Sequence, residues 1–233
     1  MPAIPNFNPD IFKAYDVRGV YPTEMNDDEA YLIGRALVQY LKAPQVAVGR
    51  DMRLSSPALA RALIRGITEQ GADAIDLGLT ATDELYFAVG KFGYPAGVMI
   101  TASHNPGSDN GLKFCREQAI PISSATGLDD MRDLIVNGKL ETPGPAGNVI
   151  PRDVLDDYIN HVFSFIDVAN IKPLKVAVDA GNGMAGMTIP RAFQRLPCEL
   201  VPLYFELDGT FPNHPASPIE PENTAELRRT VVA

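Results

Sequence analysis

Cysteine, basic residues and long apolar runs are all scarce in this sequence. Its two cysteines, Cys115 and Cys198, lie far apart and have no Cys or His neighbours at metal-ligand spacing. This pattern predicts neither a disulfide framework nor a zinc site, so we expect two ordinary thiols. Only 20 Lys and Arg residues stand against 29 Asp and Glu residues, which gives a formal net charge of -9. That charge argues against a general binder of nucleic acid or anionic membranes, whereas a small anionic substrate stays compatible with it if the few cations converge.

The hydrophobic residues are distributed as in a globular protein. They make up 45% of the 233 residues, which is enough for one large or two modest cores. No apolar run approaches the roughly 20 residues that span a bilayer. The first residues lack the charged-then-apolar order of a signal peptide, and we therefore expect a cytoplasmic protein.

Helices and strands alternate in the first part of the chain. Apolar residues recur at helical spacing over 28–41, and the pair Asn26-Asp27 supplies a capping side chain. The same reasoning predicts strands at 45–48, 74–77 and 96–100, helices at 56–70 and 83–89, and a loop at 49–51. This alternation predicts an α/β layer fold with crossover connections.

A Pro- and Gly-rich stretch over 137–151 interrupts this pattern and predicts a linker or exposed loop. We therefore expect one layered αβα domain with a mixed sheet over 1–142 and a second, incomplete one of the same type over 143–233. In the second domain we expect helices at 154–166, 188–196 and 223–232 and strands at 175–178 and 200–205. The acidic pairs 129–130 and 156–157 are typical of the first turns of helices, where the dipole favours negative charge.

The segment richest in reactive side chains follows directly after the predicted strand 96–100. It is Thr101-Ala-Ser-His-Asn-Pro-Gly-Ser-Asp-Asn-Gly-Leu-Lys113. Ligands of open α/β sheets bind at the carboxyl ends of strands. Ser103 offers a nucleophile and His104 a proton-transfer group, although adjacent residues rarely form the hydrogen bond of a hydrolase triad. From these residues alone an ordinary loop remains an equal alternative, since Ser, Asn and Gly are common turn formers.

Five motifs in order give the chain a family resemblance. Thr101-Ala-Ser-His-Asn-Pro106 with Asn110-Gly-Leu-Lys113 resembles the phosphoserine loop of the α-D-phosphohexomutases, which include phosphomannomutase and phosphoglucomutase. Further segments resemble the same family: Phe12-Lys-Ala-Tyr-Asp-Val-Arg-Gly19, Gly49-Arg-Asp-Met-Arg53, Val178-Asp-Ala-Gly-Asn-Gly183, and Asp208-Gly-Thr-Phe-Pro-Asn-His214 with Pro221-Glu-Asn223. The resemblance covers essentially the whole chain.

The resemblance implies a role for each matching residue. Ser103 would carry the transferable phosphate, His104 would orient or protonate beside it, and Lys113 would be a cation near the reacting phosphate. Tyr15 and Arg18 would bind sugar or phosphate. In that family a phosphoserine donates to a hexose monophosphate, the bisphosphate intermediate turns over, and its other phosphate returns to the serine, which interconverts 1- and 6-phosphates of mannose or glucose. Phosphoryl transfer needs alignment and charge neutralisation above all, and this set of residues suits it.

The resemblance also implies cofactors. In the complete enzyme Mg²⁺ would bind Ser103 through its phosphate, and glucose 1,6-bisphosphate would be the activator. The other metal ligands would come from a downstream loop of Asp-Gly-Asp-Gly-Asp type, which the sequence does not contain. We therefore expect a fragment that lacks the metal loop and the C-terminal domains, with little or no turnover by itself.

Two alternatives compete with a mutase. Gly181-Asn-Gly183-Met-Ala-Gly186 satisfies the dinucleotide pattern G-x-G-x-x-G, with Glu206 about 20 residues further on, as in an NAD-dependent oxidoreductase. The structural alternative for this segment is a βαβ unit with tight glycine turns. The second alternative is a non-catalytic phosphosugar-binding half. The preferred hexose and the oligomeric state are not predicted by the sequence.

Overall fold

A computed structural model describes residues 7–142 and 144–232. By their contacts these residues form two compact units. The first unit contains the described residues up to Asp51, Ser55–Ala102 and Ser108–Asp153. The second contains Met52–Leu54, Ser103–Gly107 and the described residues from Val154 onward.

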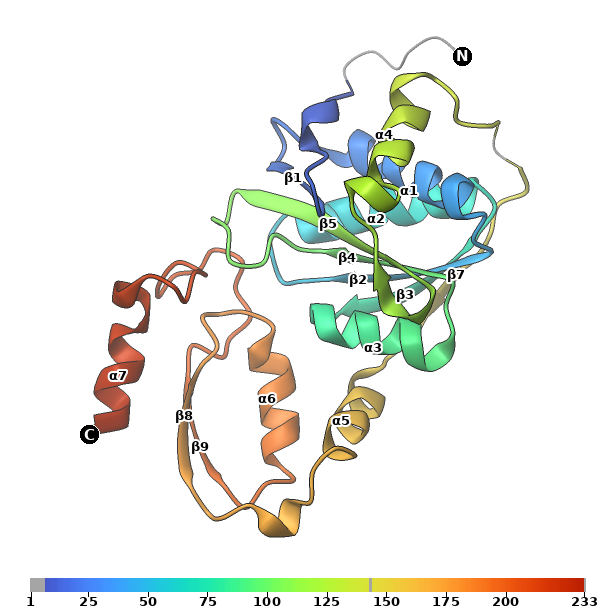
Figure 1. The fold of residues 1–233 in the computed structure, drawn as a ribbon. Helices are drawn as coiled ribbons and strands as arrows, with labels where there is room; N and C mark the ends of the chain where they lie inside the picture. The colour runs from blue at the N-terminus through green and yellow to red at the C-terminus, as the bar shows by residue number, and fades with distance from the viewer. Residues whose placement is uncertain (1–6, 143, 233) are drawn as a thin grey trace. The chain divides into compact units, whose positions relative to one another are not determined.

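The first unit is built on a mixed sheet with the order β1-β5-β4-β2-β3-β7, and β6 pairs with β5 (Figure 1). Its strands are β1 (Val17–Val20), β2 (Gln45–Arg50), β3 (Asp73–Leu79), β4 (Ala96–Ile100), β5 (Asp109–Arg116), β6 (Ile120–Pro121) and β7 (Val149–Pro151). Strands β4, β2, β3 and β7 run parallel, whereas β5 is antiparallel to both of its main neighbours, β1 and β4.

Helices cover both faces of this sheet (Figure 1). They are α1 (Asp27–Leu41), α2 (Ser56–Glu69), α3 (Thr82–Phe92) and α4 (Leu128–Val136). Alternate residues of β4 point to opposite faces, as a strand requires: Val98 and Ile100 join the main core with α1, α2 and α4, while a β-carbon on Gly97 would lie 2.6 Å from Val89 of α3. The predicted α/β/α layering is therefore confirmed.

Local signals explain where α1 begins. The Asn26 side chain accepts a hydrogen bond from the Asp28 amide, and the Glu29 carboxylate accepts one from the Asn26 amide, which completes a capping box. Helices α1 and α2 then cross at two glycines. A β-carbon on Gly34 would lie 2.5 Å from the Leu63 carbonyl oxygen, and one on Gly66 would lie 2.0 Å from that of Tyr31. Only glycine permits this close crossing.

Three segments differ from the sequence-based expectations. Residues 49–50, predicted as a loop, belong to β2, because that strand pairs with both β3 and β4 along this stretch. Residues 109–113, the last part of the expected loop 101–113, form the start of β5. Part of the expected linker 137–151 is β7, a short edge strand that pairs with β3.

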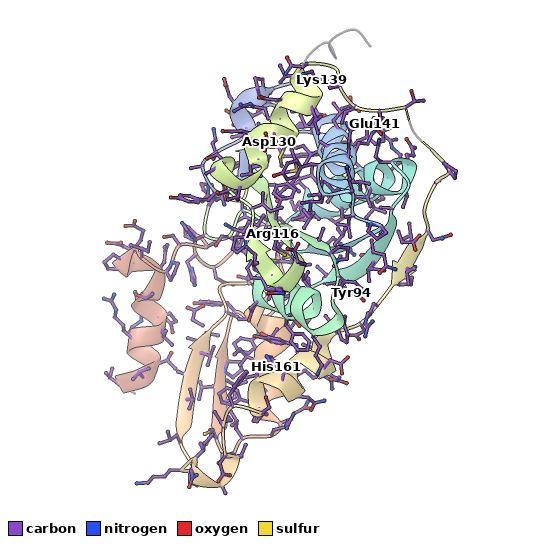
Figure 2. All side chains as sticks on the ribbon, turned by 45° about the vertical axis from the view of Figure 1, so that its right-hand side comes forward. Tyr94, Arg116, Asp130, Lys139, Glu141 and His161 are labelled. Atoms are coloured by element: carbon purple, nitrogen blue, oxygen red, sulfur yellow. The ribbon has the colours of Figure 1, made fainter. Side chains whose placement is uncertain are left out.

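The segment after α4 is also fastened to the first unit. Figure 2 labels Lys139 and Glu141 on it. Gln39 of α1 donates to the Lys139 carbonyl (3.0 Å) and accepts from the Glu141 amide (2.9 Å). Buried Arg35 of α1 donates to the Glu141 carbonyl (2.6 Å) and to the Gln70 side chain (2.8 Å). Hydrogen bonds to α1 thus hold this part of the predicted linker or exposed loop in place.

The second unit holds a smaller βαβ arrangement. It contains α5 (Leu155–Phe163), β8 (Lys175–Asp179), α6 (Ala185–Phe193), β9 (Glu199–Leu203) and α7 (Ala225–Val232). Strands β8 and β9 pair in parallel, with α6 as the crossover between them (Figure 1). The acidic pairs 129–130 and 156–157 lie in the first turns of α4 and α5, as predicted. Among the described residues, no helix is both long enough and apolar enough to cross a bilayer.

Candidate active site

The segment that carries Ser103 follows the carboxyl end of β4. The Thr101 amide donates to the Gly111 carbonyl (3.0 Å), so the chain leaves β4 and returns as β5 over a short loop. Ser103 is exposed and has φ +55°, a left-handed conformation that is uncommon outside glycine. Its Oγ lies 3.4 Å from Nδ1 of exposed His104, at the long end of the hydrogen-bond range. The predicted nucleophile and its neighbour are therefore close, although no triad is formed by this pair alone.

In the first unit, one carboxylate gathers two of the predicted cations. Asp16 Oδ2 lies 2.7 Å from an Arg18 guanidinium nitrogen and 3.4 Å from Lys113 Nζ. Arg18 lies on β1 and Lys113 on β5, which are paired strands, and this pairing explains why residues far apart in sequence meet. Arg18 also donates to the carbonyl of Ala102 (3.0 Å), the residue that precedes Ser103. The side chain of the fifth predicted residue, Tyr15, is 80% exposed and lies outside this ion-pair group.

Sequence reasoning did not single out Asp16. The only sequence feature that could have pointed to Asp16 is its position between Tyr15 and Arg18 in a family motif. No local pattern predicts its hydrogen bond with Lys113, which lies 97 residues away. With only 14% of its side chain exposed, Asp16 holds the two cations in a partly desolvated position, where ionic hydrogen bonds are stronger than in water.

In the second unit, Arg53 binds the backbone of the Ser103 loop. Its guanidinium donates to the carbonyls of Ser103 (2.9 Å), Asn105 (2.8 Å) and Pro106 (2.6 Å). Arg53 is 1% exposed. It belongs to a motif that the sequence offered as a family resemblance, yet its position predicted no role, since the carbonyls that it meets lie 50–53 residues further on.

The turn that begins at Asp208 packs on the same loop. A β-carbon on Gly107 would lie 3.4 Å from both the Gly209 carbonyl and the Phe211 ring, and the Arg53 guanidinium lies 5.2 Å from the centre of that ring. Hydrogen bonds from the Thr210 amide and hydroxyl lower the pKa of Asp208 and fix the shape of the turn. The turn 208–211 thus packs against the Gly107 end of the loop.

A buried polar network fixes the chain just after β2 and at the start of β5. Asn110 donates to the hydroxyls of Ser55 (2.8 Å) and Ser56 (3.0 Å), and Ser56 donates to the Asp51 carboxylate (2.6 Å). Asn110 and Ser56 are 0% exposed. The Asn110 amide of the phosphoserine-like motif thus serves the scaffold, together with the hydroxyls of Ser55 and Ser56.

The glycine turn that matches the dinucleotide pattern is filled by its own chain. A β-carbon on Gly186 would lie 2.1 Å from the Phe205 carbonyl oxygen, and one on Gly181 would lie 3.2 Å from the His214 ring. In a dinucleotide site these glycines let the pyrophosphate approach the backbone and let the helix pack closely. In this chain, Phe205 and His214, which follow β9, occupy the space beside these glycines.

Asn182, between two of these glycines, completes the fastening. It is 3% exposed, donates to the Glu206 carbonyl (2.9 Å) and accepts from the Asn213 side chain (2.8 Å). Glu206, the residue at ribose-binding distance in the sequence pattern, thus contributes its backbone carbonyl to the turn. The structure therefore gives no support to an NAD site at Gly181–Gly186, and the structural alternative accounts for the motif.

The described side chains offer no cluster of metal ligands. In the ranges 7–142 and 144–232, no group of three or more His, Cys, Asp and Glu side chains is placed to hold a metal ion. These residues do not fit a Mg²⁺ site, and we assign no step of a reaction to a metal held by them.

Comparisons with known proteins agree with the fold of both units. Residues 9–137 match the family model "Phosphoglucomutase/phosphomannomutase, alpha/beta/alpha domain I", and residues 156–233 match "alpha/beta/alpha domain II" of the same family. They give no support to an oxidoreductase or to a non-catalytic phosphosugar-binding half.

Individual relatives show the same similarity. "Phosphohexose mutases" of Xanthomonas campestris pv. campestris is 44% identical over 220 residues, 94% of this chain and 49% of that protein. A phosphomannomutase of Escherichia coli is 42% identical over 219 residues, 91% of this chain and 48% of that protein. The crystal structure of a phosphoglucomutase/phosphomannomutase family protein from Burkholderia thailandensis superposes with a TM-score of 0.87 at 35% identity, over 97% of this chain and 50% of that one. The chain therefore spans about half the length of these relatives.

Proposed function

Because the chain belongs to the phosphoglucomutase/phosphomannomutase family, we propose that it carries the phosphoserine of a phosphohexomutase, at Ser103. The substrate class would be a hexose monophosphate, with mannose or glucose as the sugar. The observation that carries the proposal is the conformation of Ser103: an exposed hydroxyl on a left-handed residue at the end of β4, with the carbonyl behind it bound to buried Arg53.

Each transfer would exchange one phosphorus–oxygen bond for another. In the first, the bond from phosphorus to Ser103 Oγ breaks while a hydroxyl oxygen of the hexose monophosphate bonds to phosphorus. That hydroxyl gives up its proton and the serine regains one. The second transfer returns the other phosphate of the bisphosphate to Ser103 and leaves the isomeric monophosphate.

The predicted residues would supply alignment, charge and protons. His104 Nδ1 faces Ser103 Oγ and would deliver or remove the proton there. Lys113 and Arg18 would contribute positive charge, and Asp16 would fix the direction of both cations. Tyr15, mostly exposed, would be available to the sugar. Cationic side chains of this kind can position a phosphate through charge-assisted hydrogen bonds, and positioning is the main requirement of phosphoryl transfer.

The test is phosphorylation of the chain itself. We would incubate it with glucose 1,6-bisphosphate and map phosphate by intact mass and peptide mass spectrometry. One phosphate on Ser103 is expected, lost in Ser103→Ala and retained in Ser108→Ala, which removes an exposed hydroxyl from the same loop. Phosphate that persists in Ser103→Ala, or that never enters the unsubstituted chain, would contradict the proposal.

Steady turnover is a separate measurement. We expect little conversion of glucose 1-phosphate by these 233 residues alone, because their described side chains do not fit a metal site. Sustained conversion that Ser103→Ala abolishes would overturn this expectation while leaving the phosphoserine in place.

A further inference from the structure

We propose that Arg53 is a positioning residue that sets the backbone of the loop from Ser103 to Gly107 and thereby aims Ser103. The inference rests on the proposed function, because it concerns the serine that would carry the phosphate. It adds a residue that acts on the loop from behind, through its carbonyls, and touches neither substrate nor phosphate.

The first support is the number and direction of the contacts. One guanidinium, 1% exposed, donates to three carbonyls within four consecutive residues of the loop. A guanidinium presents donors in a fixed planar fork, so the three acceptors must take defined positions around it. A lysine at the same place would offer a point charge without that planar geometry.

The second support is the effect of those contacts on the other edge of the same peptides. In a trans peptide the carbonyl and the N–H point in opposite directions. With the Ser103 carbonyl directed at Arg53, the His104 N–H points away from the guanidinium. The Pro106 carbonyl is also directed at Arg53, so the Gly107 N–H points away from the guanidinium. The peptide between Asn105 and Pro106 has no N–H, because proline lacks one. The loop therefore directs two backbone donors away from Arg53, an arrangement that favours an anion on that side.

The third support is that the arginine is itself held from behind. A β-carbon on Gly209 would lie 2.8 Å from the Arg53 Cα and 2.8 Å from the Leu54 amide nitrogen. The Phe211 ring contacts both the guanidinium and the position of Gly107. The turn 208–211 thus packs closely on the Arg53 backbone and contacts the Gly107 end of the loop.

These contacts explain how Ser103 keeps an unfavourable backbone. A non-glycine residue in the left-handed region is strained and persists when its surroundings over-determine its conformation. Ser103 at φ +55° has its own carbonyl bound by Arg53. Release of that bond would let the residue relax and would change the direction of its hydroxyl.

The test combines two readouts on the 233-residue chain: the rate at which glucose 1,6-bisphosphate phosphorylates Ser103, and amide hydrogen exchange of peptides that cover residues 101–113. Arg53→Lys keeps the charge and removes the fork. We expect faster exchange in this region and phosphorylation slowed about a hundredfold, as a small displacement of a reacting group produces. A loss of overall stability alone would not accelerate one peptide selectively.

The matched control is Arg35→Lys. Arg35 is also buried, and it also donates to a backbone carbonyl, that of Glu141, but its partners lie outside the loop. This variant should unfold more easily while its Ser103 loop exchanges and is phosphorylated as in the unsubstituted chain.

A second pair of variants keeps the proposal falsifiable if Arg53→Lys does not fold. Gly209→Ala should press on the Arg53 backbone and loosen the same loop, whereas Gly90→Ala adds a β-carbon that meets nothing within 4 Å. Unchanged loop exchange in Arg53→Lys or Gly209→Ala would overturn the proposal. If the unsubstituted chain takes up no phosphate, the proposed function fails, and loop exchange still decides whether Arg53 sets the loop.

Discussion

His214 Nε2 lies 3.1 Å from both carboxylate oxygens of Asp179, so the loop that follows β9 is fastened to the end of β8. The other ring nitrogen, Nδ1, lies 2.8 Å from the Pro215 carbonyl. Only 8% of the Asp179 side chain is exposed. The imidazole therefore joins a largely buried carboxylate to the backbone of the loop.

His214→Ala should destabilise the protein by about 1–3 kcal/mol, because the buried Asp179 carboxylate loses its side-chain partner. Urea unfolding measures the loss. His104→Ala, which removes an exposed ring, is the matched control and should stay within about 0.5 kcal/mol of the unsubstituted chain. Equal stability of the two variants would show that the Asp179 contact adds nothing.

Glu84→Gln should change how stability depends on pH. Burial raises the pKa of Glu84, which is 0% exposed, even though the Ala81 amide and the Thr80 hydroxyl donate to it. A carboxyl group with a higher pKa in the folded than in the unfolded state binds more protons when folded, so its contribution to stability falls as pH rises. This stability is lost from a pH near 4.5, the ordinary pKa of a glutamate side chain, until the pH has passed the raised pKa of the folded state.

As the pH rises through that window, the free energy of unfolding of Glu84→Gln should therefore increase relative to that of the unsubstituted chain. Urea unfolding at several pH values gives the difference. Glu29→Gln replaces the corresponding capping carboxylate of α1 and controls for the loss of a charged cap. A pH-independent difference for Glu84→Gln would show that the folded pKa is not raised.

The two thiols should differ sharply in reactivity. Burial raises the pKa of Cys115 to about 12, and its side chain is 0% exposed, whereas Cys198 is partly exposed. Because the thiolate is the reactive form, iodoacetamide at about pH 8 should label Cys198 alone in the folded chain and both residues after unfolding. Peptide mapping reads out the sites. Label on Cys115 in folded Cys198→Ser would contradict the burial of β5.

Gly66→Ala should test the crossing of α1 and α2. The new β-carbon would meet the Tyr31 carbonyl at 2.0 Å, so the helices must separate, at a cost of about 1–3 kcal/mol typical of overpacking. Gly90→Ala in α3 has open space and should stabilise the chain by about 0.4–1 kcal/mol. Thermal unfolding that ranks the two variants in the opposite order would refute the close crossing.

Local signals were sufficient for much of the fold. The strand 96–100 was predicted with its observed bounds, and α1 began one residue before the predicted start because a capping box fixes it there. Strand β5 was not predicted, since its opening Asp-Asn-Gly is typical of turns and only pairing with β1 and β4 makes it a strand. Long-range pairing overrode local preference in the same way at the end of β2.

The candidate site also combines features that the sequence predicts locally with features that depend on long-range contacts. Ser103 and His104 stand out as adjacent reactive groups, whereas the roles of all five predicted residues, with Lys113, Tyr15 and Arg18, come from the family resemblance and remain predictions. Lys113 reaches Asp16 from 97 residues away, and the carbonyls that Arg53 binds lie 50–53 residues away from it, so no local pattern predicts these contacts. Conversely, the glycine turn at 181–186 has a strong local pattern whose explanation is close packing with residues after β9.

The division of the chain into units has a consequence for building hybrid enzymes. Met52–Leu54 and Ser103–Gly107 group with the residues from Val154 onward, although they sit in sequence among strands and helices of the first unit. A graft that replaces only the serine loop would put foreign carbonyls on a resident Arg53 and a foreign residue against Gly209. Successful exchange between relatives should therefore transfer three separated stretches together, around Arg53, Ser103 and the turn 208–211, as one inherited module.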